Sequence, residues 1–144
     1  MKADKKTEAE VKAAINNFLK AYSRRDLEGA LALLAPDPDL LFIGTGADEK
    51  ILGIKRASAQ MKRDYEQSDE ISVKLGPVSI SSAGPVAWMF ADSTWRVKAG
   101  GQEMNYEWRW TMVLEKRQGK WLIAQSHLSA PAQAQAHGES FPSD

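Results

Sequence analysis

The chain has 144 residues, of which 43% are hydrophobic, and its 19 lysine and arginine residues balance its 19 aspartate and glutamate residues. This length suits one domain with a hydrophobic core, and the absence of net charge argues against binding to nucleic acid or to an anionic membrane. The chain has no cysteine and only two histidines, which excludes disulfides and thiolate chemistry and leaves no ligand cluster, so we expect no metal and no cofactor.

The first third of the sequence predicts two helices. The segment Thr7–Glu10 has the pattern of a capping box, in which a threonine and a glutamate satisfy free amide groups at a helix start. Apolar residues then recur at helical spacing from Val11 to Tyr22. Asp26 is suited to cap a second, shorter helix, which should end before Pro36.

The rest of the chain predicts a short strand, a third helix and a series of long strands. The short strand covers residues 40–43 and the helix residues 54–67. Alternation at period two then marks strands over residues 71–80, with a bend at a Gly-Pro pair, and over residues 86–97, 102–116 and 121–129. This order predicts an α+β fold: a curved antiparallel sheet that wraps around three N-terminal helices as a cone. A flat sandwich with a filled core would give the same pattern.

These elements predict one domain over residues 7–131, between a flexible N-terminus (residues 1–6) and a flexible tail (residues 132–144). The first six residues are charged and lack the apolar segment of a secretory signal. No apolar run approaches the roughly 18 residues of a membrane span. We therefore expect a cytoplasmic protein without membrane contact.

Alternation divides the late strands into two faces of different character. One face is mostly small or polar and contains Ala87, Met89, Ala91, Ser93, Trp95, Asn105, Glu107, Arg109, Thr111, Val113, Trp121, Ile123, Gln125, His127 and Ser129. The other is mostly apolar and contains Trp88, Phe90, Tyr106, Trp108, Trp110, Met112, Leu114, Leu122, Ala124 and Leu128. Hydrophobicity alone predicts that the apolar face is the core and that the polar face meets water.

Short motifs occur in a fixed order along residues 8–131. They are Phe18 to Tyr22 followed by Arg25-Asp26-Leu27, Phe42-Ile43-Gly44-Thr45 with Glu49 and Gly53, and Gly119 to Ile123 followed by His127-Leu128-Ser129. Together they resemble the nuclear-transport-factor-2-like superfamily, in particular its SnoaL-like and ketosteroid-isomerase-related members. The last strand is also similar to the association domain of calcium/calmodulin-dependent kinase II. The resemblance implies a cone with an internal ligand pocket, but fold alone does not specify function.

The resemblance also reverses the orientation that hydrophobicity predicts. In these relatives the positions that match Trp121 and His127 point into the cone, and the outer sheet face often supports dimer formation. The polar face would then line the pocket. The surface of Trp108, Trp110 and Met112 would be buried by a second subunit, which implies a homodimer through the outer sheet face.

On this orientation the candidate ligand-binding residues are Tyr22, Trp95, Asn105, Arg109, Gln125 and His127. His127 could transfer a proton, Arg109 could hold a carboxylate, and Glu107 could act as a base if apolar walls raise its pKa. Each residue also has a structural interpretation. Glu107 and Arg109 would pair within the sheet, His127 would bond a neighbour, and the two aromatic residues would pack in the core.

Three functions are consistent with the sequence. The first is binding of a small, partly apolar molecule with an anionic or carbonyl group near Arg109 and His127. The second is a cofactor-free isomerase, cyclase or dehydratase with His127 or Glu107 as acid/base and Arg109 as stabiliser of negative charge. The third is an oligomerisation module. The acidic pattern of epoxide-hydrolase relatives and the tyrosine–acid pattern of the isomerases are not recognisable in the sequence.

Overall fold

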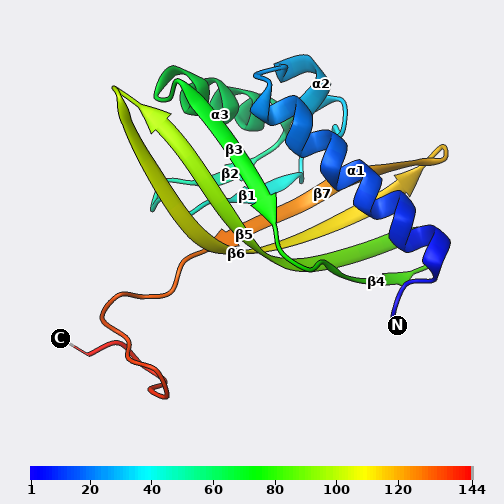
Figure 1. Ribbon diagram of the computed structural model, residues 1–144. Coiled ribbons are helices and arrows are strands. Elements are labelled where there is room, and N and C mark those ends of the chain that lie inside the picture. The colour runs from blue at the N-terminus through cyan, green and yellow to red at the C-terminus, as the bar shows by residue number, and fades with distance from the viewer. Residues whose placement is uncertain (144) are drawn as a thin grey trace.

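The computed structural model describes residues 1–143 and confirms the α+β cone. A strongly curved sheet wraps around the helices, which lie on its concave side (Figure 1). The helices of the described part are α1 (Lys5–Ser23), α2 (Leu27–Leu31) and α3 (Ile54–Glu66). The strands are β1 (Leu41–Ile43), β2 (Lys50–Leu52), β3 (Glu70–Leu75), β4 (Ser79–Ala83), β5 (Val86–Ala99), β6 (Gln102–Arg117) and β7 (Lys120–Ser129).

The strands form one open sheet in the order β2-β1-β7-β6-β5-β3, and β4 also pairs with β5. The pairings are antiparallel except that of β1 with β7, which is parallel, so the sheet is mixed rather than purely antiparallel. The predicted strand over residues 71–80 is divided at Gly76 and Pro77 into β3 and β4, which pair with successive stretches of β5. This break is consistent with a proline that has no amide hydrogen for a ladder bond.

The N-cap of α1 is Asp4 rather than Thr7. Oδ1 of Asp4 accepts a hydrogen bond from the amide of Thr7 at 2.7 Å, which satisfies one of the free amides of the first turn. Before this cap the chain lies along β4, where the buried Ala3 donates its amide to the carbonyl of Ile80 at 3.2 Å. The predicted helix start at Thr7 is therefore wrong, because the Asp4 carboxylate caps a first turn that begins at Lys5.

The strand β5 has the predicted orientation, but β6 has the opposite one. Ala91 pairs with Trp110 and Ser93 with Trp108, and side chains of directly paired residues share a face. The small residues of β5 point into the cone, so the indoles opposite them point inward as well and fill the space beside them. Trp110 is buried and Trp108 half-buried. The prediction that these tryptophans form a surface for a second subunit is wrong.

The strand β7 changes face in its middle because of a β-bulge. Leu114 of β6 pairs with Ile123, but the neighbouring Val113 pairs with Gln125, so Ala124 is an extra residue. Before the bulge Ile123 points into the core, as predicted, and is 1% exposed. After the bulge the inward-facing residues of β7 have even numbers instead of odd ones, and the buried Ser126 faces inward.

The core lies between α1 and the concave face of the sheet. Its most buried large side chains are Val11, Ile15, Leu40, Met89, Met112, Leu114 and Ile123. The second helix also follows its prediction, because Oδ1 of Asp26 accepts the amide of Gly29 at 3.0 Å. None of the helices in residues 1–143 combines the length and hydropathy that crossing a bilayer requires.

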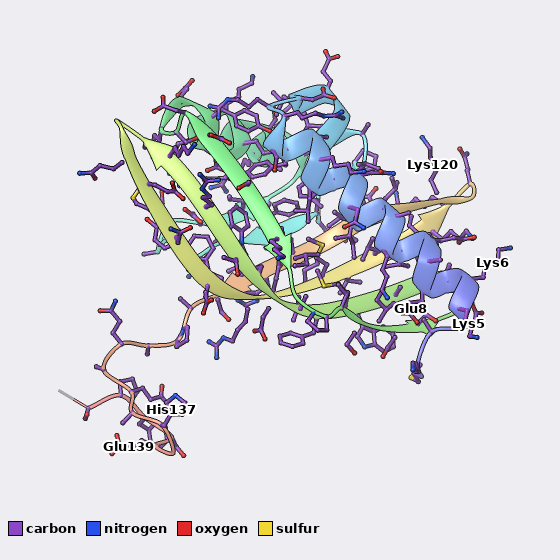
Figure 2. The ribbon with its side chains drawn as sticks, in the orientation of Figure 1. Lys5, Lys6, Glu8, Lys120, His137 and Glu139 are labelled. Carbon is purple, nitrogen blue, oxygen red and sulfur yellow. The ribbon has the colours of Figure 1, made fainter. Side chains whose placement is uncertain are left out.

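Both chain ends lie outside the cone. Lys5, Lys6 and Glu8 project from the first turn of α1, and His137 and Glu139 belong to the tail (Figure 2). From residue 130 to residue 143 the chain has turns and bends but neither helix nor strand, and it runs away from the sheet (Figure 1). Asp144, the last residue of the predicted tail, lies outside the described residues.

Candidate functional site

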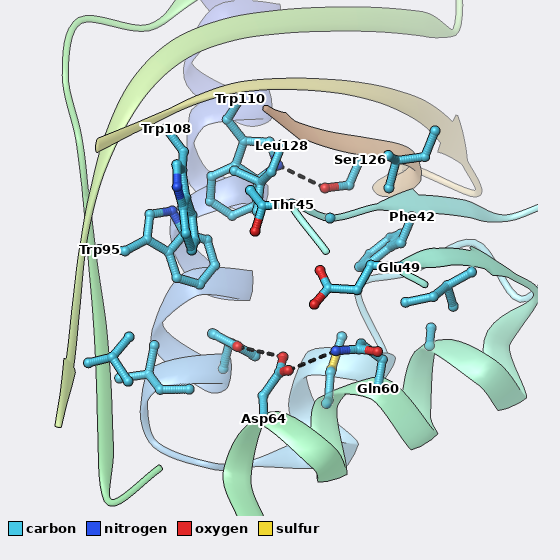
Figure 3. A pocket seen from close by; sticks show the side chains of 18 of the residues that line it. Phe42, Thr45, Glu49, Gln60, Asp64, Trp95, Trp108, Trp110, Ser126 and Leu128 are labelled. Carbon is cyan, nitrogen blue, oxygen red and sulfur yellow. Dashed lines mark hydrogen bonds between the residues drawn. The ribbon is translucent and has the colours of Figure 1, made fainter. Parts of the chain in front are cut away.

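A cavity of about 260 Å³ lies between the concave face of the sheet and the helices α1 and α3 (Figure 3). Its walls come from the end of α1, the inner side of α3, the loop between β1 and β2, and the inward side chains of β5, β6 and β7. Most of these side chains are apolar, among them Phe18, Phe42, Ile51, Met61, Ile71 and Leu128. The cone therefore has an interior that its own side chains leave partly empty.

Three tryptophans form one wall of the cavity. The ring centre of Trp95 is 5.3 Å from that of Trp108 and 5.4 Å from that of Trp110. Two of the indole N–H groups are already bonded within the protein: Trp95 donates to Ser93 Oγ at 3.1 Å, and Trp110 donates to Ser126 Oγ at 2.8 Å. What these two side chains offer to a bound molecule is therefore apolar ring surface rather than a free hydrogen-bond donor.

A chain of polar groups lies beside this wall. The hydroxyl of Tyr22 donates to Asp64 Oδ2 at 2.8 Å, and Nε2 of Gln60 donates to Asp64 Oδ1 at 2.9 Å. Burial raises the pKa of Asp64, and these two hydrogen bonds oppose that rise. Burial and the neighbouring Asp64 charge also raise the pKa of Tyr22. The arrangement is a carboxyl group that can exchange a proton within an apolar cavity.

A second carboxylate, that of Glu49, enters the cavity from the loop between β1 and β2 (Figure 3). Its Oε1 lies 3.3 Å from Nη2 of Arg63, whose Nη1 bonds Asp48 at 2.7 Å. The loop can hold the carboxylate here because of Gly44: a Cβ at this position would lie 1.7 Å from Glu49 Oε2. Glycine is therefore required for the observed position of the Glu49 side chain.

Two of the predicted site residues, Tyr22 and Trp95, line the cavity. Five others lie on the convex face of the sheet: Asn105, Glu107, Arg109 and His127 are exposed, and Gln125 is half-buried beside them. The hydroxyl of Ser129 accepts a hydrogen bond from Nε of Arg109 at 3.1 Å. The prediction that these five residues line the cavity is wrong, because β6 has the opposite orientation and the bulge reverses the end of β7.

Sequence reasoning missed Asp64 and Gln60, although the pattern of α3 contains a signal for both. Ala57 and Met61 mark the buried side of this helix. Gln60 and Asp64 follow Ala57 by three and seven residues, which is the spacing of the same helix face. Polar residues at core positions of an amphipathic helix need a partner or a function. Here they face the cavity.

The ionisable lining residues, within the part of the chain that the structure describes, are Tyr22 and two acids, Glu49 and Asp64; no lysine, arginine or histidine is among them. No group of three or more histidine, aspartate or glutamate side chains suited to a metal ion occurs within residues 1–143. The electrostatic character of the cavity therefore comes from its carboxyl groups.

Comparison with known proteins gave one family and many similar structures. The family model described as SnoaL-like domain matches residues 11–133. A nuclear-transport-factor-2-like superfamily protein from Salmonella enterica has a TM-score of 0.84 at 21% identity, over 96% of this chain and 100% of that one. A proposed dehydratase of the NTF2-like family from Streptomyces avermitilis has a TM-score of 0.80 at 16% identity, over 86% and 96%.

A third similar structure is a proposed scytalone dehydratase from Novosphingobium aromaticivorans. Its TM-score is 0.77 at 10% identity, over 85% of this chain and 82% of that one. Comparison with curated protein sequences gave no match. At these identities the structural likeness shows the fold and leaves the chemistry of the cavity to be argued from its own residues.

Proposed function

Because the chain belongs to the family of SnoaL-like domains, we propose that the cavity inside its cone binds a small, partly apolar organic molecule. The observation that carries this proposal is the wall of three tryptophans around a space of about 260 Å³. Enclosed apolar surfaces with a few polar groups are the usual form of small-molecule sites. The polar chain of Tyr22, Gln60 and Asp64 would fix the orientation of the ligand.

This proposal is tested by blocking the cavity. Thr45 and Thr111 are both exposed, but Thr45 lines the cavity and Thr111 lies on the convex face. In a screen of small aromatic and alicyclic compounds, the compounds that raise the melting temperature of the protein should bind at least tenfold more weakly to Thr45→Trp. Thr111→Trp should retain their affinity. Equal weakening by both substitutions, or by neither, would place the binding site elsewhere.

We propose cofactor-free acid–base catalysis of the isomerase, cyclase or dehydratase type as a second candidate function. The observation in its favour is Asp64, which is bonded to Tyr22 and Gln60 inside the cavity and has a pKa raised by burial. A buried carboxyl group with a raised pKa, hydrogen-bonded inside a cavity, is suited to act as a general acid or base. Glu107 and His127 do not reach the cavity, so Asp64 takes the role that the sequence analysis gave to them.

We also propose that two copies of the chain pair through the convex face. Two large apolar side chains are exposed there, Trp88 at 38% and Phe90 at 44%. Phe90 pairs across the sheet with Thr111, and Thr111 with His127, so the apolar patch is continuous with the polar row. Exposed aromatic patches with polar surroundings are typical of protein interfaces.

The dimer is tested at Phe90. Phe90→Asp would place a charge at the centre of the patch and should convert the dimer to a monomer in sedimentation velocity, with at least a hundredfold higher dissociation constant. Lys74→Asp, at an exposed position of β3, is the control and should leave the dimer intact. A wild-type chain that sediments as a monomer at all concentrations would contradict the proposal.

A further inference from the structure

Three tryptophan rings line one wall of the cavity. Trp95 and Trp110 turn their N–H groups to the serines of the sheet, and Tyr22 stands edge-on to Trp95 at a centroid distance of 6.0 Å, with its hydroxyl bonded to Asp64. The electron-rich face of an indole attracts a cation more strongly than that of any other side chain. Indole rings gathered on one wall of the cavity therefore favour a positively charged group over a neutral group of equal size.

The charges of the cavity act in the same direction. Its two carboxyl groups belong to Glu49 and Asp64, and no basic side chain is among the described residues that line it. Arg63 contacts Glu49 at 3.3 Å but also pairs with Asp48 at 2.7 Å. One positive charge is therefore shared between two carboxylates. An anionic ligand would find no cationic side chain among the described lining residues, whereas a cation would find both indole rings and negative charge.

The state of Asp64 gives a further reason. Burial makes its ionised form unfavourable, and the nearby Glu49 charge adds to that effect. A cation in the cavity would remove this penalty by supplying the missing counter-charge. The expectation of an anionic group near Arg109 and His127 has no support in this geometry, because both residues lie on the other side of the sheet.

We propose that the cavity binds an organic cation, a quaternary or protonated amine with a small apolar body. This inference rests on the proposed function, since it needs a ligand within the cavity, and it adds the charge of that ligand. The ammonium group would lie beside the tryptophan rings, within the field of Glu49 and Asp64. The apolar body would contact the aliphatic lining.

The test compares ligands that differ in charge alone. Choline and 3,3-dimethylbutan-1-ol have nearly the same shape, with a quaternary nitrogen in one and a carbon in the other; phenyltrimethylammonium and tert-butylbenzene form a second such pair. Titration calorimetry should show at least tenfold tighter binding of the cation in at least one pair. Benzoate, as an anionic probe, should not bind.

Variants locate the charge preference. In Asp64→Asn and in Glu49→Gln the advantage of the cation over its neutral isostere should fall at least threefold, and Trp108→Leu should weaken the cation more than the isostere. Asp92→Asn is the matched control, because Asp92 is an exposed acid on the convex side of β5, and it should keep the full preference. Melting curves establish that each variant is folded.

The outcomes separate the two proposals. If neutral or anionic probes bind at least as tightly as their cationic counterparts, the cation inference is overturned while the proposed ligand site stands. If cationic, neutral and anionic probes all fail to bind, both are overturned. A preference for the cation that survives in Asp64→Asn and Glu49→Gln but disappears in Asp92→Asn would move the site to the convex face and contradict the inference.

Discussion

Replacing Leu114 by alanine should lower the free energy of unfolding by about 2–5 kcal/mol, whereas replacing Arg109 should change it by less than about 0.5 kcal/mol. Both residues belong to β6 but lie on opposite faces of the strand. Leu114 is fully buried between the sheet and α1, so its truncation removes apolar contacts and leaves a void. Arg109 is exposed, and its hydrogen bond to Ser129 competes with water.

Urea denaturation at one fixed protein concentration measures both effects. Thr111→Ala on the convex face is the control and should behave like Arg109→Ala, because Thr111 is also exposed. The comparison decides the orientation of β6, on which the whole location of the site depends. A large loss of stability in Arg109→Ala together with a small one in Leu114→Ala would mean that the polar face is buried after all.

Asp64→Asn should lower activity and change how stability depends on pH. For a reaction catalysed in the cavity, loss of the acid/base should lower kcat by about 10²–10⁴-fold, while His127→Ala and Glu107→Gln should leave kcat within about twofold because those side chains lie outside the cavity. Turnover that survives in Asp64→Asn and disappears in His127→Ala would contradict the assignment.

The stability effect of Asp64→Asn depends on pH. The pKa of Asp64 is raised in the folded protein above its ordinary value of 3.8, so the folded state binds this proton more tightly than the unfolded state does. Its stabilising contribution is present at pH values below 3.8 and is lost as the pH rises through the folded-state pKa. Asparagine does not titrate, and its carbonyl can still accept the Tyr22 hydroxyl.

The difference in melting temperature, Asp64→Asn minus wild type, should therefore become more positive between pH 3.5 and pH 7. Carboxyl groups whose pKa is lowered by partners, such as Glu10 and Asp37, produce the reverse trend in both proteins and cancel in the difference. Scanning calorimetry of both proteins at several pH values measures this difference in melting temperature. A difference that is constant with pH would show that Asp64 keeps an ordinary pKa.

The orientation of β6 was predictable from the turn before it. Gly100 and Gly101 both have positive φ and form a two-residue turn, so Ala99 pairs with Gln102. In such a hairpin each odd-numbered residue faces an even-numbered one, and their side chains share a face. The small odd-numbered residues of β5 therefore share the concave face with even-numbered tryptophans. The sequence analysis instead placed the odd-numbered residues of β5 and β6 on the same face. That assignment put Arg109 inside the cone and Trp110 outside, and it was the error.

The bulge in β7 was harder to predict. Ala124 lies in a run of residues with unbroken strand character, and neither glycine nor proline marks it. One extra residue reverses every side chain that follows, which moves His127 from the concave to the convex face. Local alternation predicts strands well, but a change of register in the middle of a strand depends on packing across the whole sheet.

The fold itself was within reach of the sequence because long segments of consistent periodicity define it. The stripe from Val11 to Tyr22 predicted α1, and the Gly-Pro pair predicted a bend at the place where the structure divides β3 from β4. The site depends instead on contacts between distant segments. Tyr22 and Asp64 are 42 residues apart and meet only where the last turn of α1 comes against α3.

The measurement that tests the central claim most directly is a two-dimensional NMR titration that follows the five tryptophan indole N–H signals as the tightest-binding compound of the screen is added. The signals of Trp95, Trp108 and Trp110 should shift, because these side chains line the cavity. Those of Trp88, on the convex face, and of Trp121, bonded to Glu10 at 2.9 Å, should stay in place. A shift of the Trp88 signal, with the signals of the three cavity indoles unchanged, would contradict a binding site inside the cone.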